Sequence, residues 1–237
     1  MLTTKPELPV LRIDSLGDPD LYGMLLVDKA QGWSSFDVVK RLRRLSGIKK
    51  IGHAGTLDPM ATGLLICLLG SKATRAQDAW TNEDKVYTGV MRFGQTTDSY
   101  DAETPIREHR ILPANFEAAL ADALPLFRGD ITQEVPIYSA VKKGGKRLYR
   151  YARAGEEVTL PKRSVTIKNF TVKLINNTDV SFEVACSKGT YIRSLAHELG
   201  QQLGVGAHLI ALRRIMIGSL SVSEASRLDH AMTDTVG

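Results

Sequence analysis

The segment that most constrains this chain is residues 52–63, GHAGTLDPMATG, together with the apolar run from Leu64 to Leu69 that follows it. Glycine, proline and threonine are frequent in the segment, which is typical of a tight loop, and its one acidic residue is Asp58. The short, continuously apolar run predicts a buried strand. Because reactive groups often sit on loops that a rigid scaffold holds, the pattern predicts a carboxylate placed for chemistry at the edge of that strand.

The composition is that of a globular protein, with 237 residues of which 43% are hydrophobic and 24% charged. No apolar run is long enough to span a bilayer and the N-terminus does not have the pattern of a signal peptide, so we expect a cytoplasmic protein without a membrane partner. Cys67 and Cys186 both fall in apolar runs, which indicates buried, reduced thiols. The spacing of cysteine and histidine does not indicate a metal site, and we expect none.

Basic residues gather in two stretches that contain no acidic residue. One runs from Lys40 to Lys50 and the other from Lys142 to Arg153, in a chain whose net charge is +5. Either stretch alone would be typical of a solvated face, but two of them favour a polyanionic partner. Aromatic residues make up only 6% of the chain, which argues against a stacking platform for long single strands and favours a folded RNA or a duplex.

Local signals favour an α+β fold over a doubly wound parallel sheet, because strands and helices alternate irregularly. A helix is expected to begin at Ser34 or Ser35 and to end at Gly47. The other expected helices cover residues 72–80, 113–123, 147–154, 190–203 and 223–231. Strands are expected at residues 22–28, 64–69, 85–93, 164–174, 180–187 and 208–217, with another from residue 131 onward. Residues 176–179 predict a hairpin turn and residues 95–105 a polar loop.

Asp58 has two interpretations. An aspartate before a proline often caps a turn. A carboxylate on such a loop can also act as a nucleophile or general base, as in retaining glycosidases, which form a glycosyl-enzyme ester. Those enzymes need a second carboxylic acid to protonate the leaving group. None lies near Asp58 in the sequence, although Asp98 and Asp101 are candidates to approach it in space.

Three further residues are candidates to serve a site around this carboxylate. Arg193 follows a tight glycine turn at the start of an expected helix, where it either contacts a phosphate or solvent, or pairs with Asp58 and aims it. Tyr87 lies in an expected strand, where most tyrosines pack, but its ring could also stack on a base while its hydroxyl takes part in proton transfer. His53 either braces the loop by hydrogen bonds or stacks beside an extruded base.

Five segments, in the same order, resemble the TruB family of tRNA pseudouridine synthases. Residues 52–65 resemble its catalytic motif, with Asp58 at the place of the catalytic aspartate. Residues 28–35 resemble its N-terminal motif, although Ala30 and Ser34 replace the usual proline and threonine. The other three segments are residues 85–103 with the active-site tyrosine at Tyr87, residues 139–153 with an RNA-gripping insertion, and residues 186–195 with the active-site arginine at Arg193.

The resemblance covers most of the chain and implies the pseudouridine synthase fold, a mixed and mainly antiparallel central sheet flanked by helices. We expect an irregular arm at residues 1–21 and a catalytic domain at residues 22–237, with an RNA-binding insertion at about 135–163. Many bacterial relatives carry a PUA domain at the C-terminus. Because the chain ends soon after residues 223–228, we expect no PUA domain here.

The implied reaction converts uridine 55 in the T loop of tRNA to pseudouridine. It is an isomerisation, so we expect no cofactor and no metal, in keeping with a sequence that has no phosphate-binding or dinucleotide-binding fingerprint. Asp58 would be the catalytic carboxylate, with Arg193 holding it and Tyr87 stacked on the uracil. Three routes stay open, because Asp58 could attack ribose carbon 1′, remove the 2′ proton, or add to carbon 6 of the ring.

The implied partner is the T-arm stem-loop of tRNA, bound by a monomer. The expected RNA contacts are His53, Lys29, Arg41, Arg44, Lys142, Lys143, Lys146, Arg147, Arg150 and Arg153. The main alternative is a non-catalytic RNA-binding or RNA-folding module, in which Asp58 is structural. A second alternative is a glycoside or nucleoside hydrolase built on Asp58, which would release free uracil instead of keeping the base attached.

Overall fold

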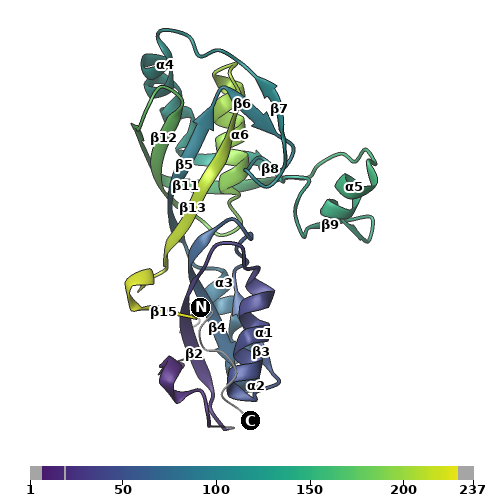
Figure 1. The fold of residues 1–237 in the computed structure, drawn as a ribbon, viewed down its shortest axis with the longest axis vertical. Coiled ribbons are helices and arrows are strands. Elements are labelled where there is room, and N and C mark those ends of the chain that lie inside the picture. The colour runs from purple at the N-terminus through teal and green to yellow at the C-terminus, as the bar shows by residue number, and fades with distance from the viewer. Residues whose placement is uncertain (1–6, 19, 229–237) are drawn as a thin grey trace. The chain divides into compact units, whose positions relative to one another are not determined.

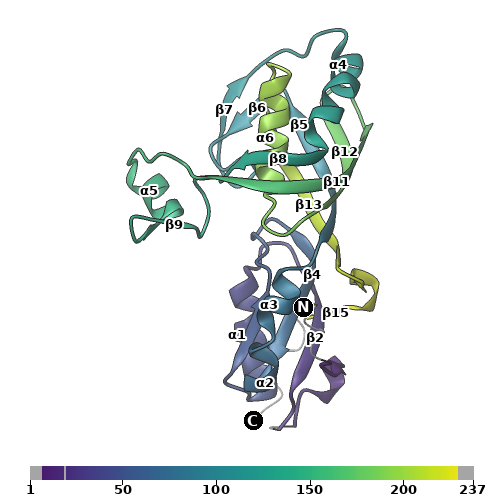
Figure 2. The same ribbon diagram turned by 180° about the vertical axis from the view of Figure 1, so that it is seen from behind.

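The structure is a computed structural model that describes residues 7–18 and 20–228 (Figures 1 and 2). The chain forms two compact units. The first unit holds the described parts of Met1–Tyr87 and Arg213–Gly237, and the second unit is Thr88–Leu212. The chain passes from one unit to the other inside two strands, β5 (Lys85–Phe93) and β13 (Ala207–Ile217). Both strands were predicted from the sequence, β5 with the same bounds.

The first unit is built around β4 (Thr62–Leu69), the strand predicted from the apolar run. One edge of β4 pairs antiparallel with β2 (Gly23–Lys29) along its whole length. The other edge pairs antiparallel with β3 (Ile51–Ala54) and, nearer the start of β4, in parallel with the last part of β13. Seven of its eight residues are buried, so both faces of the strand are covered, as a continuous apolar run requires.

Three helices pack against β3 and β4, and both views show them on the same side of these strands. The longest, α1 (Ser35–Ser46), begins with a capping box in which the Ser34 side chain accepts from the Asp37 amide, and it ends at Gly47 in a left-handed conformation. Both boundaries were predicted. The single helix expected at residues 72–80 is wrong: Ala76 leaves the helical conformation, and the segment forms α2 (Gly70–Thr74) and α3 (Gln77–Thr81).

The last described residues also differ from the prediction. The helix expected at residues 223–231 is wrong over its described part, and residues 229–231 lie outside it. A single 3-10 turn, η3 (Val222–Glu224), is closed by a capping box between Ser221 and Glu224. The chain then becomes extended because β15 (Ser226–Arg227) pairs with β2. The expected arm at the N-terminus includes one short strand, β1 (Val10–Leu11), also paired with β2.

The second unit has four neighbouring strands in the order β5, β12 (Asp179–Cys186), β11 (Lys162–Leu174) and β8 (Gly129–Glu134). β11 is antiparallel to both of its neighbours, and its predicted hairpin with β12 turns at Asn176, whose side chain accepts from the amides of Thr178 and Asp179. Two helices accompany the strands, α4 (Phe116–Ala123) and α6 (Ile192–Gln202), and α6 packs against β8. The α+β class and the mixed, mainly antiparallel sheet are thus confirmed.

The second unit also contains two small hairpins. The first joins β6 (Gln95–Thr97) to β7 (Ile106–His109), so the prediction of a polar loop at 95–105 was wrong for residues 95–97, which form a strand. The second joins β9 (Lys142–Lys143) to β10 (Lys146–Arg147) and leads into α5 (Leu148–Ala154), which ends at Gly155 as predicted. Their strands are too short and too polar for the alternation on which the prediction depended.

The described residues contain no helix that is long and apolar enough to cross a membrane. Within the same part of the chain, no group of three or more histidine, cysteine or acidic side chains could hold a metal ion. Cys67 and Cys186 are buried thiols, as predicted, and burial raises the pKa of the Cys67 thiol to about 12. Cys67 therefore stays protonated at neutral pH and belongs to the core.

Candidate active site and RNA-binding surfaces

Asp58 lies in the loop between β3 and β4, on a segment whose neighbours are buried. Leu57 and Met60 are 3% and 7% exposed, while Asp58 is partly exposed between them. The Asp58 carbonyl accepts from the Ala61 amide at 3.1 Å, which closes a turn around the carboxylate. The loop is thus anchored by apolar side chains and leaves the Asp58 carboxylate accessible, the combination predicted for a reactive group on a rigid support.

Side chains at the end of β2 and the start of α1 fasten this loop. The Ser35 hydroxyl accepts from the Leu57 amide at 2.8 Å and donates to the Leu57 carbonyl at 3.2 Å. The Lys29 ammonium donates to the carbonyls of Trp33 and Pro59 at 2.6 and 3.3 Å. Lys29 is only 1% exposed, so it has almost no surface to offer to RNA. We therefore remove Lys29 from the set of proposed RNA contacts, because its ammonium already satisfies loop carbonyls.

A buried arginine, Arg214, fastens the loop at both ends. Its Nη2 donates to the Gly55 carbonyl at 2.9 Å and its Nε to the Leu64 carbonyl at 2.8 Å. Arg214 is 1% exposed and belongs to the part of β13 that pairs with the start of β4. A Cβ on Gly63 would lie 2.2 Å from the Arg214 carbonyl oxygen, and Gly63 has a φ of 100°, so this approach requires glycine.

Sequence reasoning missed Arg214, because it placed the residue in a strand without a role. The available signal was an arginine inside an otherwise apolar strand, which is costly unless its charge is paired or hydrogen-bonded. Which carbonyls accept those hydrogen bonds depends on a contact across more than a hundred residues of chain. No local pattern specifies such a contact.

His53 and Tyr87 also lie in the first unit. His53 is in β3 opposite Cys67, and burial together with the positive charge of Arg214 lowers its pKa, so its imidazole is neutral at neutral pH. Its Nδ1 is buried and has no hydrogen-bond partner among the described residues. Tyr87 lies in β5 and is 8% exposed. A stacking role for either ring stays a prediction.

Arg193 lies in the second unit, in the first turn of α6 as predicted, and it is 4% exposed. Its two terminal nitrogens donate to the carbonyls of Ser99 and Tyr138 at 2.9 and 3.0 Å. Its Nε lies 3.6 Å from a carboxylate oxygen of the buried Asp101. The guanidinium is therefore held in one orientation by two different segments of the unit, residues 99–101 and Tyr138. Because Asp58 belongs to the first unit, its pairing with Arg193 stays a prediction.

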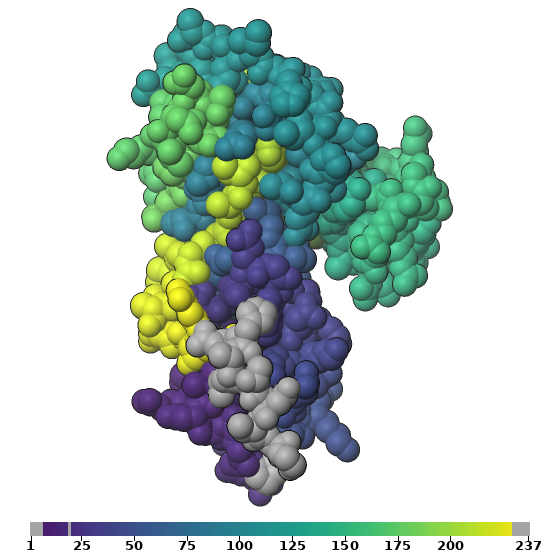
Figure 3. Space-filling view, in the orientation of Figure 1, coloured from purple at the N-terminus to yellow at the C-terminus, as the bar shows by residue number. Residues whose placement is uncertain are grey.

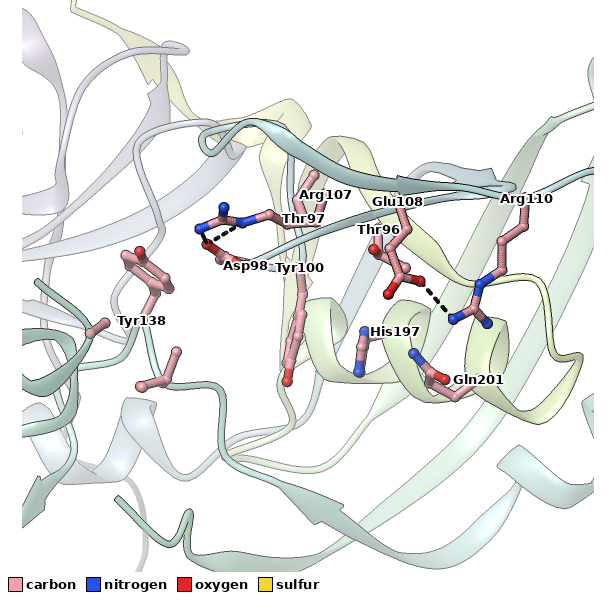
Figure 4. A pocket seen from close by; sticks show the side chains of 12 residues that line it. Thr96, Thr97, Asp98, Tyr100, Arg107, Glu108, Arg110, Tyr138, His197 and Gln201 are labelled. Carbon is pink, nitrogen blue, oxygen red and sulfur yellow. Dashed lines mark hydrogen bonds and ion pairs between the residues drawn. The ribbon is translucent and has the colours of Figure 1, made fainter. Parts of the chain in front are cut away.

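A cavity of about 440 Å³ lies in the second unit beside this arrangement (Figure 4). Its walls include Tyr100, Tyr138, His197 and Gln201, and two ion pairs, Asp98 with Arg107 and Glu108 with Arg110. Neither Asp98 nor Asp101 is available as a ready acid partner, because Asp98 pairs with Arg107 and Asp101 with Arg193. The second carboxylic acid of a glycosidase site is therefore not supplied by these two residues.

The first basic stretch lies on α1. Lys40, Arg43 and Arg44 are exposed, and Arg41 is half-buried with its Nη2 lacking a hydrogen-bond partner among the described residues. Lys40, Arg41 and Arg44 line a cavity of about 330 Å³ together with Trp33. The apolar residues Val38, Val39 and Leu42 face the core, so the helix packs and presents positive charge at the same time.

The second basic stretch spans β9, β10 and α5. One buried side chain, Leu148, anchors this segment, and most of its other residues are exposed, as the space-filling view also shows (Figure 3). Five of its cations are exposed, namely Lys142, Lys143, Arg147, Arg150 and Arg153. The sixth, Lys146, pairs with Glu156 at 2.7 Å and lies over the Tyr151 ring. The segment thus presents a dense positive surface.

Replacing Arg214 tests whether it fixes the Asp58 loop. In Arg214→Met the carbonyls of Gly55 and Leu64 lose a buried donor, which should destabilise the protein by about 1–3 kcal/mol for each unsatisfied group. Amide hydrogen exchange across residues 55–61 should then accelerate. The matched control, Arg213→Met, removes a partly exposed pair with Asp28 and should leave exchange in the loop unchanged. Equal exchange of this loop in both variants would contradict the role of Arg214.

Comparison with known proteins shows the family to which the chain belongs. The chain matches the model of the TruB family pseudouridylate synthase N-terminal domain over residues 43–192, and the tRNA pseudouridylate synthase B C-terminal domain over residues 193–234. Proteins called tRNA pseudouridine synthase B are similar, at 48% identity in Thermobifida fusca strain YX (88% of this chain, 73% of the relative) and 46% in Bordetella avium strain 197N (92% and 90%).

Two solved structures have the same fold. A Cbf5-Nop10-Gar1 complex contains a chain 29% identical, with a TM-score of 0.67 over 95% of this chain. An H/ACA RNP bound to a substrate RNA containing 2′-deoxyuridine contains a chain 29% identical, with a TM-score of 0.63 over 86% of this chain. This chain spans 58% and 50% of the length of those two chains. The likeness confirms the expected pseudouridine synthase fold. By sequence and by fold, the chain belongs to the TruB family of pseudouridylate synthases.

Proposed function

We propose that this protein is an isomerase that converts uridine to pseudouridine in tRNA, at position 55 of the T loop, with Asp58 as its catalytic carboxylate. The observation that carries the proposal is the Asp58 loop itself. A partly exposed carboxylate stands on a segment that Ser35, Lys29 and Arg214 fasten by hydrogen bonds. Relatives that are 46–48% identical to this chain are called tRNA pseudouridine synthase B.

The reaction rearranges one bond and needs no net transfer to or from the enzyme. The bond between uracil nitrogen 1 and ribose carbon 1′ breaks, the base turns, and its carbon 5 bonds to the same ribose carbon. The proton of carbon 5 leaves, and nitrogen 1 ends protonated. Uracil departs as a stabilised anion, so a single carboxylate can suffice without the acid partner that glycosidases use.

Each proposed role follows from the surroundings of the residue. The buried Arg193 guanidinium, oriented by Ser99, Tyr138 and Asp101, would present a fixed charge to Asp58 in the assembled site. Tyr87 would stack on the uracil and receive the proton of carbon 5. His53, neutral because it is buried beside Arg214, could enter the space that the extruded base leaves without adding a charge. Extruding a base costs a few kcal/mol, which such contacts offset.

The two basic stretches would hold the phosphates of the T arm. Arg41 and Arg44 on α1, together with the exposed cations of the segment around α5, are positioned to contact phosphates. Contacts of this kind make RNA affinity fall steeply with salt and contribute little sequence information. Recognition would then depend on the folded shape of the T loop, as is usual for RNA.

Tritium release separates this proposal from a non-catalytic RNA-binding module. With tRNA labelled at uracil carbon 5, the wild-type protein should release tritium, because carbon 5 exchanges its proton for the ribose bond. Asp58→Asn keeps the size of the side chain but should lower release by about 1,000-fold or more. Asp122→Asn removes the same charge from the exposed face of α4 and should release tritium at the wild-type rate. A wild-type protein that binds tRNA and releases no tritium would overturn the proposal.

Arg193→Lys tests whether the guanidinium serves catalysis. An ammonium cannot replace a planar fork that holds three partners, so turnover should fall by about 100-fold or more while tRNA affinity changes little. The control is Arg92→Lys, in the two-bond pair with Asp179, which should keep wild-type turnover. Collapse of tRNA binding, with normal turnover of the RNA that does bind, would show instead that Arg193 is a phosphate ligand.

A further inference from the structure

We propose that the cavity of Figure 4 binds one unstacked nucleobase of the RNA on the open face of the Tyr100 ring, and that this base is not the one being isomerised. The inference rests on the proposed function, since it takes the partner to be a folded RNA loop. The cavity is lined only by residues of the second unit, and Asp58, which the target nucleotide must reach, is not among them.

Tyr100 offers a prepared stacking surface. Its ring lies parallel to that of His197, with 3.8 Å between ring centroids and 11° between planes. Burial lowers the pKa of His197, so the imidazole behind Tyr100 is neutral at neutral pH. Figure 4 shows His197 against one face of Tyr100, while the other face is turned toward the side of the cavity where Tyr138 lies. A base placed there would extend an existing stack of two rings.

The backbone of Tyr100 has a strained conformation. Its φ is 63°, and it is the one non-glycine residue with positive φ among residues 7–18 and 20–228. A bulky side chain in this conformation is an outlier of a kind that clusters at functional sites. The turn is kept by two backbone hydrogen bonds, from the Tyr100 amide to Thr97 and from the Leu209 amide to Tyr100.

The rest of the cavity suits the edge and the far face of a base. Tyr138 provides a second aromatic wall, and the Asp98–Arg107 pair lies above the gap between the two tyrosines in Figure 4. A carboxylate beside a guanidinium presents both acceptors and donors, which match the mixed edge of a nucleobase. The volume of about 440 Å³ falls within the usual range of small-ligand sites.

The proposed base site adjoins the surroundings of Arg193. Ser99 and Asp101, on either side of Tyr100, both contact the Arg193 guanidinium, and so does the Tyr138 carbonyl. His197 follows Arg193 by four residues on α6, so the two side chains lie on the same face of the helix. Tyr100 could therefore serve only to position Arg193, and the experiment has to separate that role from base binding.

The test combines abasic RNA with two variants of Tyr100. A synthetic T-arm stem-loop is made intact and with an abasic residue at each loop position in turn, apart from the target. Dissociation constants are measured by fluorescence anisotropy for wild type, Tyr100→Phe and Tyr100→Asn. Phenylalanine keeps the ring. Asparagine removes it but tolerates positive φ, so the turn that carries Ser99 and Asp101 is preserved.

For wild type and Tyr100→Phe, one abasic position should weaken binding by about 5- to 150-fold, which corresponds to the ~1–3 kcal/mol of a base stacked on an aromatic ring. Tyr100→Asn should bind intact RNA more weakly by a similar factor. In this variant the same abasic change should lower RNA affinity by less than about twofold, because the effects of two groups in contact with each other on affinity do not add. The loss in Tyr100→Asn should appear in the dissociation constant for the RNA.

Three results would overturn the base site. The first is wild-type binding that no abasic position weakens, and the second is full additivity of the losses from Tyr100→Asn and from the abasic residue. A fall in maximal rate with unchanged RNA affinity would show that Tyr100 only positions Arg193. Failure of the proposed function is distinct, because it would appear as absent turnover of intact RNA by wild type, whatever the binding data show.

Discussion

The hydrogen bonds from Arg214 to the two ends of the Asp58 loop are the interaction on which the first unit depends. The guanidinium is removed from water, and burying a charge is costly unless its donors are satisfied. Backbone carbonyls of Gly55 and Leu64 satisfy Nη2 and Nε, so the same bonds that make burial tolerable also fix the loop. Asp58 can stay partly exposed because Arg214, which holds the loop, is buried beneath it.

The second unit also holds a buried arginine by hydrogen bonds. Arg193 is buried, two carbonyls and the carboxylate of Asp101 hold its guanidinium, and these partners come from two separate segments. Groups held in this way need little reorganisation during a reaction, which is how preorganised charges assist catalysis. The strained Tyr100 lies inside one of those segments, so a base bound on its ring would contact the structure that orients Arg193. Recognition of RNA and orientation of the guanidinium would then share residues.

Features with local causes could be predicted from the sequence, and features with long-range causes could not. The Ser34 cap and Gly47 end of α1, the buried β4 and the turn at Asn176 each depend on a few neighbouring residues. The loop pattern indicated Asp58 and the tight glycine turn indicated Arg193, and the structure reproduces their loop and helix positions. Lys29, which lies in the motif ahead of the basic helix, was expected to contact RNA. Its burial depends on the Pro59 carbonyl, thirty residues away.

The account is tested most directly by mapping pseudouridine at each position of a whole tRNA after incubation with the protein. A carboxylate that acts on a folded loop should modify one site, so we predict pseudouridine at uridine 55 alone. Its amount should rise to one pseudouridine per tRNA molecule. Release of free uracil would instead identify a hydrolase. Pseudouridine scattered over several uridines, or none at all in tRNA that the protein binds, would contradict the account.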